Sequence, residues 1–278
     1  MKFFSNILLL VFFLIFVSCS NKDKISVIKD ENIELQMIDA YKEGVKALED
    51  NDILFASKKF NEAELLYPQS IWAPKSVLMA AYAYYSQDYY SDAIYEVKRF
   101  IKTYPKHPEV SYAHFLLAMC YYETIIDEKK DLEPILNAKK TFTYVVQTYP
   151  DTDFALDSSF KLDFIEDMLA GKEMYIALHY IKKEKWIPAI NRYKFVVENF
   201  STTIYVEEAL HRLVEIYYKI GLVEESRKYA SVLGYNYGSG KWYKESYRVF
   251  NKDYSIKKRQ VKKTKRGFIV EKFKSLFE

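Results

Sequence analysis

The segment 234–241, GYNYGSGK, is the stretch of this sequence that comes nearest to a phosphate-binding loop. Such a loop follows the pattern GxxxxGK[ST], in which backbone N–H groups and the lysine hold the phosphates and the hydroxyl binds magnesium. Starting the pattern at Gly234 places Ser239 where the second glycine is needed, and Trp242 follows Lys241 in place of Ser or Thr. The segment therefore does not meet the requirements of a nucleotide-binding loop.

Metal-binding and nucleophilic groups are too dispersed in the sequence to form a site. The histidines are His107, His114, His179 and His211. No two of them lie four residues apart, the spacing at which one helix face presents two zinc ligands, and the chain has no closely spaced cysteine pair. A GxSxG nucleophile motif is also missing. We therefore predict a protein that is not an enzyme and that needs no metal and no cofactor.

Cys19 is the residue whose position predicts a covalent modification. It follows an apolar run of eleven residues, Ile7–Val17, which is too short for a membrane span of about 20 residues. With the small residue Ser18 before the cysteine, this start resembles a bacterial lipoprotein signal. The resemblance implies that residues 1–18 are removed, that Cys19 is acylated, and that residues 19–35 form a lipidated tether. The alternatives are a signal peptide cut elsewhere and an uncleaved anchor.

Composition favours an all-α fold. Among 278 residues there are 26 tyrosines and 19 phenylalanines, but only seven glycines and seven prolines. Few helix breakers and much aromatic area are typical of a protein in which helices pack on one another. The second cysteine, Cys120, lies in an apolar stretch expected to be helical, so we predict a buried, unreactive thiol without a disulfide partner.

A helical pattern recurs along the chain from about residue 36 to residue 235, with small residues and a proline at the offsets of the tetratricopeptide repeat. The first repeat carries Gly44, Ala56, Phe60, Ala63 and Pro68. The second carries Ala81, Tyr84, Ala93, Val97 and Pro105, and its Ala93 lies 37 residues after Ala56 of the first. In such a repeat the small residues let two helices approach, the aromatic residue fills the space between them, and the proline ends the second helix.

The repeats are expected to fall into two groups, repeats 1–3 over residues 36–150 and repeats 4–5 over residues 151–237. An insertion at 125–134 lengthens a turn of the third repeat. Residues 154–183 form a longer helical pattern, a linker helix or helix pair, with Gly171 as its one expected interruption. Stacked helix pairs bury a continuous core and leave a groove that binds a peptide or a partner domain. We therefore predict an all-α tetratricopeptide-repeat solenoid of about five helix pairs.

The predicted tail, residues 238–278, is basic. Residues 251–278 contain ten Lys or Arg and three Asp or Glu, a net charge of +7, in a chain whose net charge is +3. A solvated end without a function is one interpretation, and an amphipathic segment that docks on an anionic membrane or an acidic partner is another. Nucleic acid is not expected as a partner, because an exported lipoprotein would not meet it.

A set of short motifs over about residues 38–237 carries a further resemblance. The motifs are Tyr67-Pro68, Ala81-Tyr82-Ala83-Tyr84-Tyr85, Arg99-Phe100-Ile101, Pro105-Lys106-His107-Pro108 with Tyr112, the long pattern at 154–183, and Ala189-Ile190-Asn191-Arg192. Together with the lipoprotein-like start, they resemble the BamD family, the tetratricopeptide lipoproteins of the outer-membrane β-barrel assembly machinery.

This resemblance implies a lipid-anchored protein on the outer membrane that faces the periplasm and has two kinds of partner. The later repeats would bind the periplasmic domains of the barrel-forming assembly subunit, and the early repeats would bind unfolded outer-membrane proteins. Arg192, preceded by Asn191, matches the family's arginine at the contact with that subunit. The candidates for a precursor groove are Tyr82, Tyr84, Tyr85 and Tyr112, although aromatic residues at helical spacing also suit a core.

Three functional hypotheses remain at this point. The main one is a non-catalytic scaffold that couples precursor recognition to the barrel-forming subunit, so that loss of the protein lowers outer-membrane barrels as a class. The second is a tetratricopeptide lipoprotein adaptor for cell-wall synthesis or for a secretion or pilus apparatus, whose loss would leave most barrels unaffected. The third is an enzyme within the helical array, which a turnover lost on a single-residue change would support.

Overall fold

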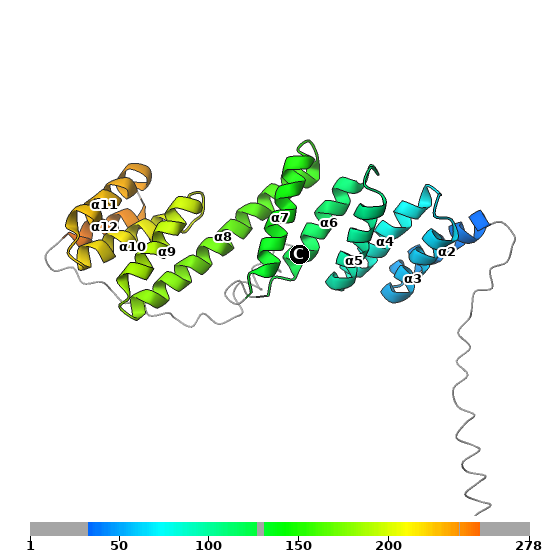
Figure 1. Ribbon diagram of the computed structural model, residues 1–278, viewed down its shortest axis with the longest axis horizontal. Helices are drawn as coiled ribbons and strands as arrows, with labels where there is room; N and C mark the ends of the chain where they lie inside the picture. The colour runs from blue at the N-terminus through cyan, green and yellow to red at the C-terminus, as the bar shows by residue number, and fades with distance from the viewer. Residues whose placement is uncertain (1–32, 127–130, 239, 251–278) are drawn as a thin grey trace, which may run out of the picture. The chain divides into compact units, whose positions relative to one another are not determined.

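The computed structural model describes residues 33–126, 131–238 and 240–250, and the regular secondary structure of these residues is entirely α-helical (Figure 1). The helices are α2 (Ile33–Glu49), α3 (Ile53–Leu66), α4 (Trp72–Ser86), α5 (Tyr90–Thr103), α6 (Val110–Glu123), α7 (Glu133–Thr148), α8 (Asp153–Lys182), α9 (Trp186–Asn199), α10 (Val206–Lys219), α11 (Val223–Tyr237) and α12 (Lys241–Val249). The fold is an all-α tetratricopeptide-repeat solenoid, as predicted from the sequence.

The helices belong to two compact units. The first unit ends at Gln87 and contains α2 to α4, in which α3 packs against both of its neighbours. The second unit begins at Asp88 and contains α5 to α12, in which each helix up to α11 packs on the next and α12 packs on α10 and α11. The grouping of repeats into residues 36–150 and 151–237 stays a prediction. Helix α12 lies within residues 238–278, the basic tail predicted from the sequence.

Four of the turns between consecutive helices contain a residue in the left-handed region of backbone space, a common way to end a helix. These residues are Asn51 (φ 63°), Asp88 (φ 64°), Glu184 (φ 57°) and Gly221 (φ 85°). They follow α2, α4, α8 and α10, respectively. Asn51 and Asp88 are 37 residues apart, and so are Glu184 and Gly221. The 37-residue repeat predicted from alanine spacing is therefore also present in the backbone.

The core of the first unit is built around Phe60, which is fully buried on α3. A Cβ atom on Gly44 of α2 would lie only 2.8 Å from two carbons of the Phe60 ring. Ala56 and Ala63, also on α3, are fully buried as well. The predicted division of roles is confirmed, because small residues bring the helices together and the aromatic ring fills the space between them.

Helix α8 is a single helix of 30 residues. It begins after Thr152, whose Oγ1 accepts a hydrogen bond from the Ala155 N–H at 3.2 Å. The predicted interruption at Gly171 is wrong, because the helix continues through it. A Cβ atom at Gly171 would lie 3.1 Å from the hydroxyl oxygen of Tyr205, so this glycine permits a close approach rather than a break.

The length of α8 allows it to join two cores of the second unit. Its first half contributes Ile165 to a cluster with Phe142 of α7. Its second half contributes Met174 and Ala177 to a larger cluster with α9 and α10. Helix α8 therefore links the core of the middle repeats to the core of the later ones.

Cys120 lies on α6 and is buried, as predicted. Burial raises the pKa of its thiol to about 12, so the thiol is protonated at neutral pH. Among the described helices, none is both long and apolar enough to cross a membrane. Cys19 and the predicted signal peptide lie outside the described residues.

Candidate partner-binding surfaces

Arg192 lies on α9 and is held in place by a carboxylate of the preceding helix. Its Nη1 donates to Oε2 of Glu173 on α8 at 2.8 Å. The Arg192 side chain is nevertheless 43% exposed, whereas that of Glu173 is only 15% exposed. Because a guanidinium has five N–H donors, this pairing leaves donors directed to solvent. The structure thus presents a cation in a fixed position, with the means to bind a partner's carboxylate or carbonyl.

A depression of about 380 Å³ surrounds this arginine. Its lining residues are Tyr180, Ile187, Pro188, Asn191, Arg192 and Phe195. Ile187 and Phe195 are exposed apolar side chains, and Asn191 is exposed as well. An arginine beside apolar and aromatic side chains is the composition found at binding hot spots. We call these six residues the α9 surface. It brings the two predicted contact residues together, but their role in binding stays a prediction.

The four tyrosines predicted for a precursor groove lie in different compact units. Tyr82, Tyr84 and Tyr85 are on α4 of the first unit, and Tyr112 is on α6 of the second. Tyr82 is exposed, whereas Tyr84 packs against the core of the first unit. The Tyr112 ring packs against Phe154 with centroids 5.5 Å apart. Of the four, Tyr82 has the exposure expected of a contact residue.

A groove along α2 was not predicted from the sequence. It has a volume of about 460 Å³ and is lined by Ile38, Tyr41, Lys42, Val45, Lys46, Glu49 and Trp72, which we call the α2 groove. The Tyr41 ring meets the Trp72 ring edge-on at 5.0 Å, which forms an aromatic wall. Six of the seven residues follow a helical spacing in α2 and were visible in the sequence. Trp72 comes from α4, so only the folded unit completes the groove.

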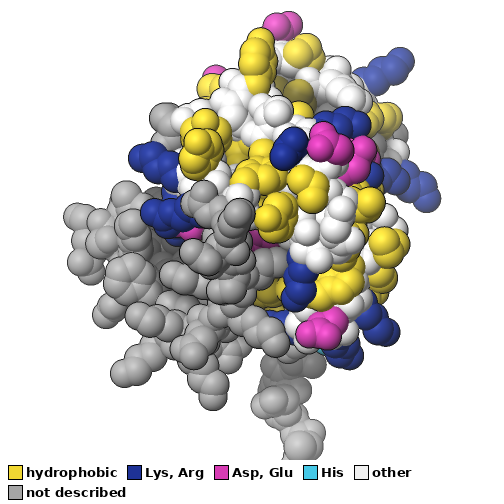
Figure 2. Space-filling view, turned by 90° about the vertical axis from the view of Figure 1, so that its left-hand side faces the viewer, with side chains coloured by type: hydrophobic (Ala, Val, Ile, Leu, Met, Phe, Trp, Pro, Cys, Tyr) yellow, Lys and Arg dark blue, Asp and Glu magenta, His cyan; other side chains and the backbone are white. Residues whose placement is uncertain are grey.

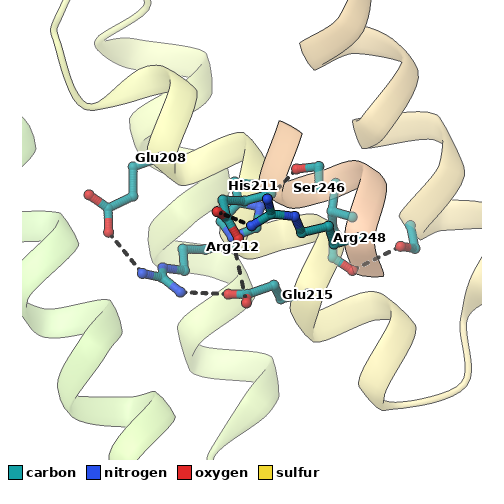
Figure 3. Close-up of polar contacts among 9 residues, drawn as sticks. Glu208, His211, Arg212, Glu215, Ser246 and Arg248 are labelled. Carbon is teal, nitrogen blue, oxygen red and sulfur yellow. Dashed lines mark hydrogen bonds and ion pairs between the residues drawn. The ribbon is translucent and has the colours of Figure 1, made fainter. Parts of the chain in front are cut away.

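The C-terminal helices enclose a network of buried polar side chains (Figure 3). Nδ1 of His211 on α10 and Oγ of Ser246 on α12 share a hydrogen bond of 2.8 Å. Nε2 of His211 lies 3.5 Å from Oε1 of Glu215. Arg212 pairs with Oε2 of Glu215 at 2.6 Å and with Glu208 at 3.1 Å. The network therefore fastens α12 to α10.

The order Ser246, His211, Glu215 in this network matches the chemistry of a hydrolase triad, but its burial does not. These three residues are only 1–3% exposed. The Trp242 ring covers His211 with centroids 5.1 Å apart, so a substrate carbonyl cannot reach the serine hydroxyl. We interpret the network as structural. Among the described residues, no group of three or more His, Cys, Asp or Glu is placed to hold a metal ion.

Glu215 is the most strongly perturbed carboxyl of this network. Burial alone would raise its pKa, but the hydrogen bond with His211 and the charge of Arg212 outweigh that effect. The pKa of Glu215 therefore falls from 4.5 to about 2. The carboxylate stays ionised throughout the neutral range, as an ion pair with Arg212 requires.

On the face of the second unit that carries α11, exposed apolar side chains are interspersed with Lys, Arg, Asp and Glu (Figure 2). The ion pairs on α11 are local to one helix, such as Arg227 with Glu224 at 3.4 Å and a spacing of three residues. Solvated pairs of this kind contribute little to stability. Arg227 is therefore a suitable control for Arg192, because Arg192 pairs with a carboxylate of another helix, α8.

Comparison with family models matches residues 33–233 to YfiO, described as an outer membrane lipoprotein. The outer membrane protein assembly factor BamD of Caulobacter vibrioides is 39% identical over 233 residues, covering 84% of this chain and 76% of the relative. BamD of Rickettsia prowazekii is 38% identical over 242 residues, covering 87% of this chain and 94% of the relative. Among solved structures, the TPR2AB domain of yeast Sti1 is similar with a TM-score of 0.42 and 12% identity, covering 77% of this chain and 81% of that one.

Proposed function

Because the chain belongs to the YfiO family of outer membrane lipoproteins, which includes the BamD assembly factors, we propose that it is a non-catalytic scaffold with two kinds of protein partner. Its role is in outer-membrane protein assembly. In this proposal the α9 surface binds the periplasmic domains of the barrel-forming assembly subunit. The α2 groove and the early repeats bind unfolded outer-membrane proteins. Acylation of Cys19, which lies outside the described residues, holds the protein on the outer membrane, facing the periplasm.

The observation that best supports the first contact is the pairing of Arg192 with Glu173. A flexible arginine loses side-chain entropy when a partner binds it, and an arginine already held by a carboxylate loses less. The exposed Ile187 and Phe195 add apolar area beside the cation. Such an arrangement fits a protein partner better than a small ion.

The experiment is co-purification from detergent-solubilised membranes. Arg192→Gln is preferred to a charge reversal, because a glutamate there would face Glu173 and disturb the fold. We expect Arg192→Gln to reduce recovery of the barrel-forming subunit at least about tenfold, as for a hot-spot arginine. Glu173→Gln keeps the Arg192 cation but removes its ion-pair partner, so we expect recovery of the subunit to fall about three- to fivefold. Arg227→Gln, the matched control on α11, should leave recovery unchanged.

The possible outcomes separate the parts of the proposal. Equal recovery with wild type and Arg192→Gln would retain the assembly role but remove the α9 surface from the contact. If no barrel protein is recovered with wild type while other membrane complexes remain intact, the adaptor hypothesis for cell-wall synthesis or secretion replaces this one.

The second contact has its own test, because the α2 groove combines an apolar lining with exposed lysines. Apolar side chains of an unfolded barrel strand would enter the groove, and its carboxylates would meet Lys42 at the rim. We expect Lys42→Glu to weaken binding of a urea-unfolded outer-membrane barrel protein about fivefold, as measured by fluorescence anisotropy. Lys58→Glu, an exposed lysine on α3 that does not line this groove, is the control. Equal effects of the two variants would exclude the groove as the precursor site.

A further inference from the structure

An apolar ridge follows the solvent-facing side of the first half of α8. Leu156, Phe160 and Phe164 recur every four residues, so they form one stripe along the helix. Their exposed fractions are 59%, 58% and 58%. Large apolar side chains gathered in this way, rather than scattered singly, are typical of a docking site. We call these three residues the α8 ridge.

The side chains beside the α8 ridge are acidic. Asp153, Asp157 and Asp163 lie on the same half of the helix and are exposed. Within the part of the chain that the structure describes, none of these carboxylates is in an ion pair. Residues 151–167 hold six carboxylates and one lysine, a net charge of −5, and one of these carboxylates, Glu166, pairs with Lys139 of α7 at 3.4 Å. The lysine within residues 151–167, Lys161, has its Nζ 4.4 Å from the centroid of the Tyr122 ring. An occupant of the ridge should therefore be both apolar and strongly cationic.

The chain itself contains a segment with this chemistry. Residues 257–277, KKRQVKKTKRGFIVEKFKSLF, contain nine Lys or Arg and a single Glu. Their large apolar side chains fall together near the end, at Phe268, Ile269, Phe273, Leu276 and Phe277. This segment lies outside the described residues. Its charge is opposite to that of the ridge, and it carries apolar side chains that could cover Leu156, Phe160 and Phe164.

The chain between α12 and residues 257–277 is long enough for this segment to reach the α8 ridge. Phe268 follows the last described residue, Phe250, by 18 positions, and an extended chain of that length spans about 60 Å. Helix α8, with its 30 residues, is about 45 Å long, and it belongs to the same compact unit as α12. The segment is thus long enough to reach the ridge of its own molecule.

We propose that residues 257–277 dock on the α8 ridge of the same molecule. The apolar side chains cover Leu156, Phe160 and Phe164, and the lysines and arginines pair with Asp153, Asp157 and Asp163. The attraction between exposed charges is screened by salt, over about 8 Å at physiological ionic strength, so docking weakens as salt is raised. The interaction is independent of the α9 surface and of the α2 groove.

Photocrosslinking in the intact chain tests this proposal. The photoreactive residue p-benzoylphenylalanine replaces Phe160, and in a control sample it replaces the exposed Leu65 of α3. After irradiation in detergent, crosslinked peptides are identified by mass spectrometry. We expect links from position 160 to residues 257–277 about fivefold more often than from position 65. Links mainly to another protein, covalent dimers of this chain, or equal yields from both positions would each overturn the proposal.

Charge variants show whether the carboxylates hold the segment. Asp157→Lys combined with Asp163→Lys should lower the crosslink yield from position 160 about fivefold, because two attractions become repulsions. Asp39→Lys combined with Asp50→Lys changes the net charge equally on exposed residues of α2 and its following turn. This control should leave the yield unchanged. An equal loss in both double variants would show that only the overall charge matters, and would refute the proposed site.

A reciprocal exchange of charge distinguishes direct pairing from a structural effect on α8. Lys272→Glu and Lys274→Glu are added to the chain that carries Asp157→Lys and Asp163→Lys. We expect the crosslink yield to recover to within about twofold of wild type, because opposite charges again face each other. A yield that stays low would contradict the pairing of these lysines with the ridge carboxylates.

Discussion

Replacing Glu215 by glutamine is expected to lower the free energy of unfolding by about 3–5 kcal/mol, the usual cost of breaking a buried ion pair. Glutamine preserves the size of the side chain but removes the charge that faces Arg212 and His211. The Arg212 guanidinium, whose side chain is 13% exposed, then has Glu208 as its one remaining ion-pair partner among the residues that the structure describes. Urea unfolding at pH 7 measures the effect, followed by tryptophan fluorescence because Trp242 packs on His211 and Arg212.

The control is Glu224→Gln on α11, which breaks an ion pair whose glutamate is 87% exposed. Its effect should stay within about 0.5 kcal/mol. If the two glutamine variants are equally stable, the network does not hold α12 in place. Arg212→Met combined with Glu215→Met should cost less than the sum of the single changes, because no charge is then left buried alone.

The same carboxyl predicts a dependence of stability on pH. Its pKa is lowered in the folded state, so its contribution is complete above the unfolded value of about 4.5 and is lost as pH falls through the folded value of about 2. Wild type should therefore lose about 3 kcal/mol more than Glu215→Gln as pH falls from 5 to 2. Parallel stability curves for the two proteins over this range would contradict the lowered pKa.

Truncating Phe60 to alanine is expected to destabilise the first unit by about 3–5 kcal/mol, because the ring is fully buried and the helices around it cannot close the cavity. The α2 backbone at Gly44 already lies so close to the ring that a Cβ atom there would be only 2.8 Å from it. Phe142, fully buried on α7, is the corresponding aromatic residue of the third repeat. Its replacement by alanine should destabilise the protein by a similar amount.

Leu65→Ala is the matched control, because it shortens an apolar side chain of the same helix that is 76% exposed. Its effect on urea unfolding should be within about 0.5 kcal/mol. A cost for Phe60→Ala as small as that of Leu65→Ala would show that Phe60 is not the centre of this core.

Several features of the fold followed directly from the sequence. The packing of Phe60 against Gly44 involves residues of one repeat, and the 37-residue period is the spacing of equivalent residues in successive repeats. Such contacts are formed by helix periodicity and short turns, which sequence spacing describes well. The expected interruption at Gly171 was wrong because the role of this glycine depends on a residue distant in the chain. That residue is Tyr205, which lies in the next repeat and is not visible in the local pattern.

For the candidate sites too, some residues could be selected from the sequence, whereas their contacts with distant segments could not. Asn191 and Arg192 were selected by resemblance, but the pairing with Glu173 across two helices appears only in the structure. Tyr112 was predicted to line one groove with Tyr82, Tyr84 and Tyr85, but it lies in a different compact unit and packs on Phe154. The α2 groove was not predicted, because Trp72, which completes it, belongs to another helix.

The sequence by itself determined that this chain is a helical repeat with a lipoprotein-like start and a basic end. Composition, helical period and net charge are properties of residues near one another in the chain, so they can be read without coordinates. Only the tertiary structure decided which apolar side chains remain exposed, beside the paired Arg192 and along the α8 ridge. It also decided that α12 packs on α10 through His211 and Ser246. The reason is physical, since burial and ion pairing depend on distances between segments that lie far apart in sequence.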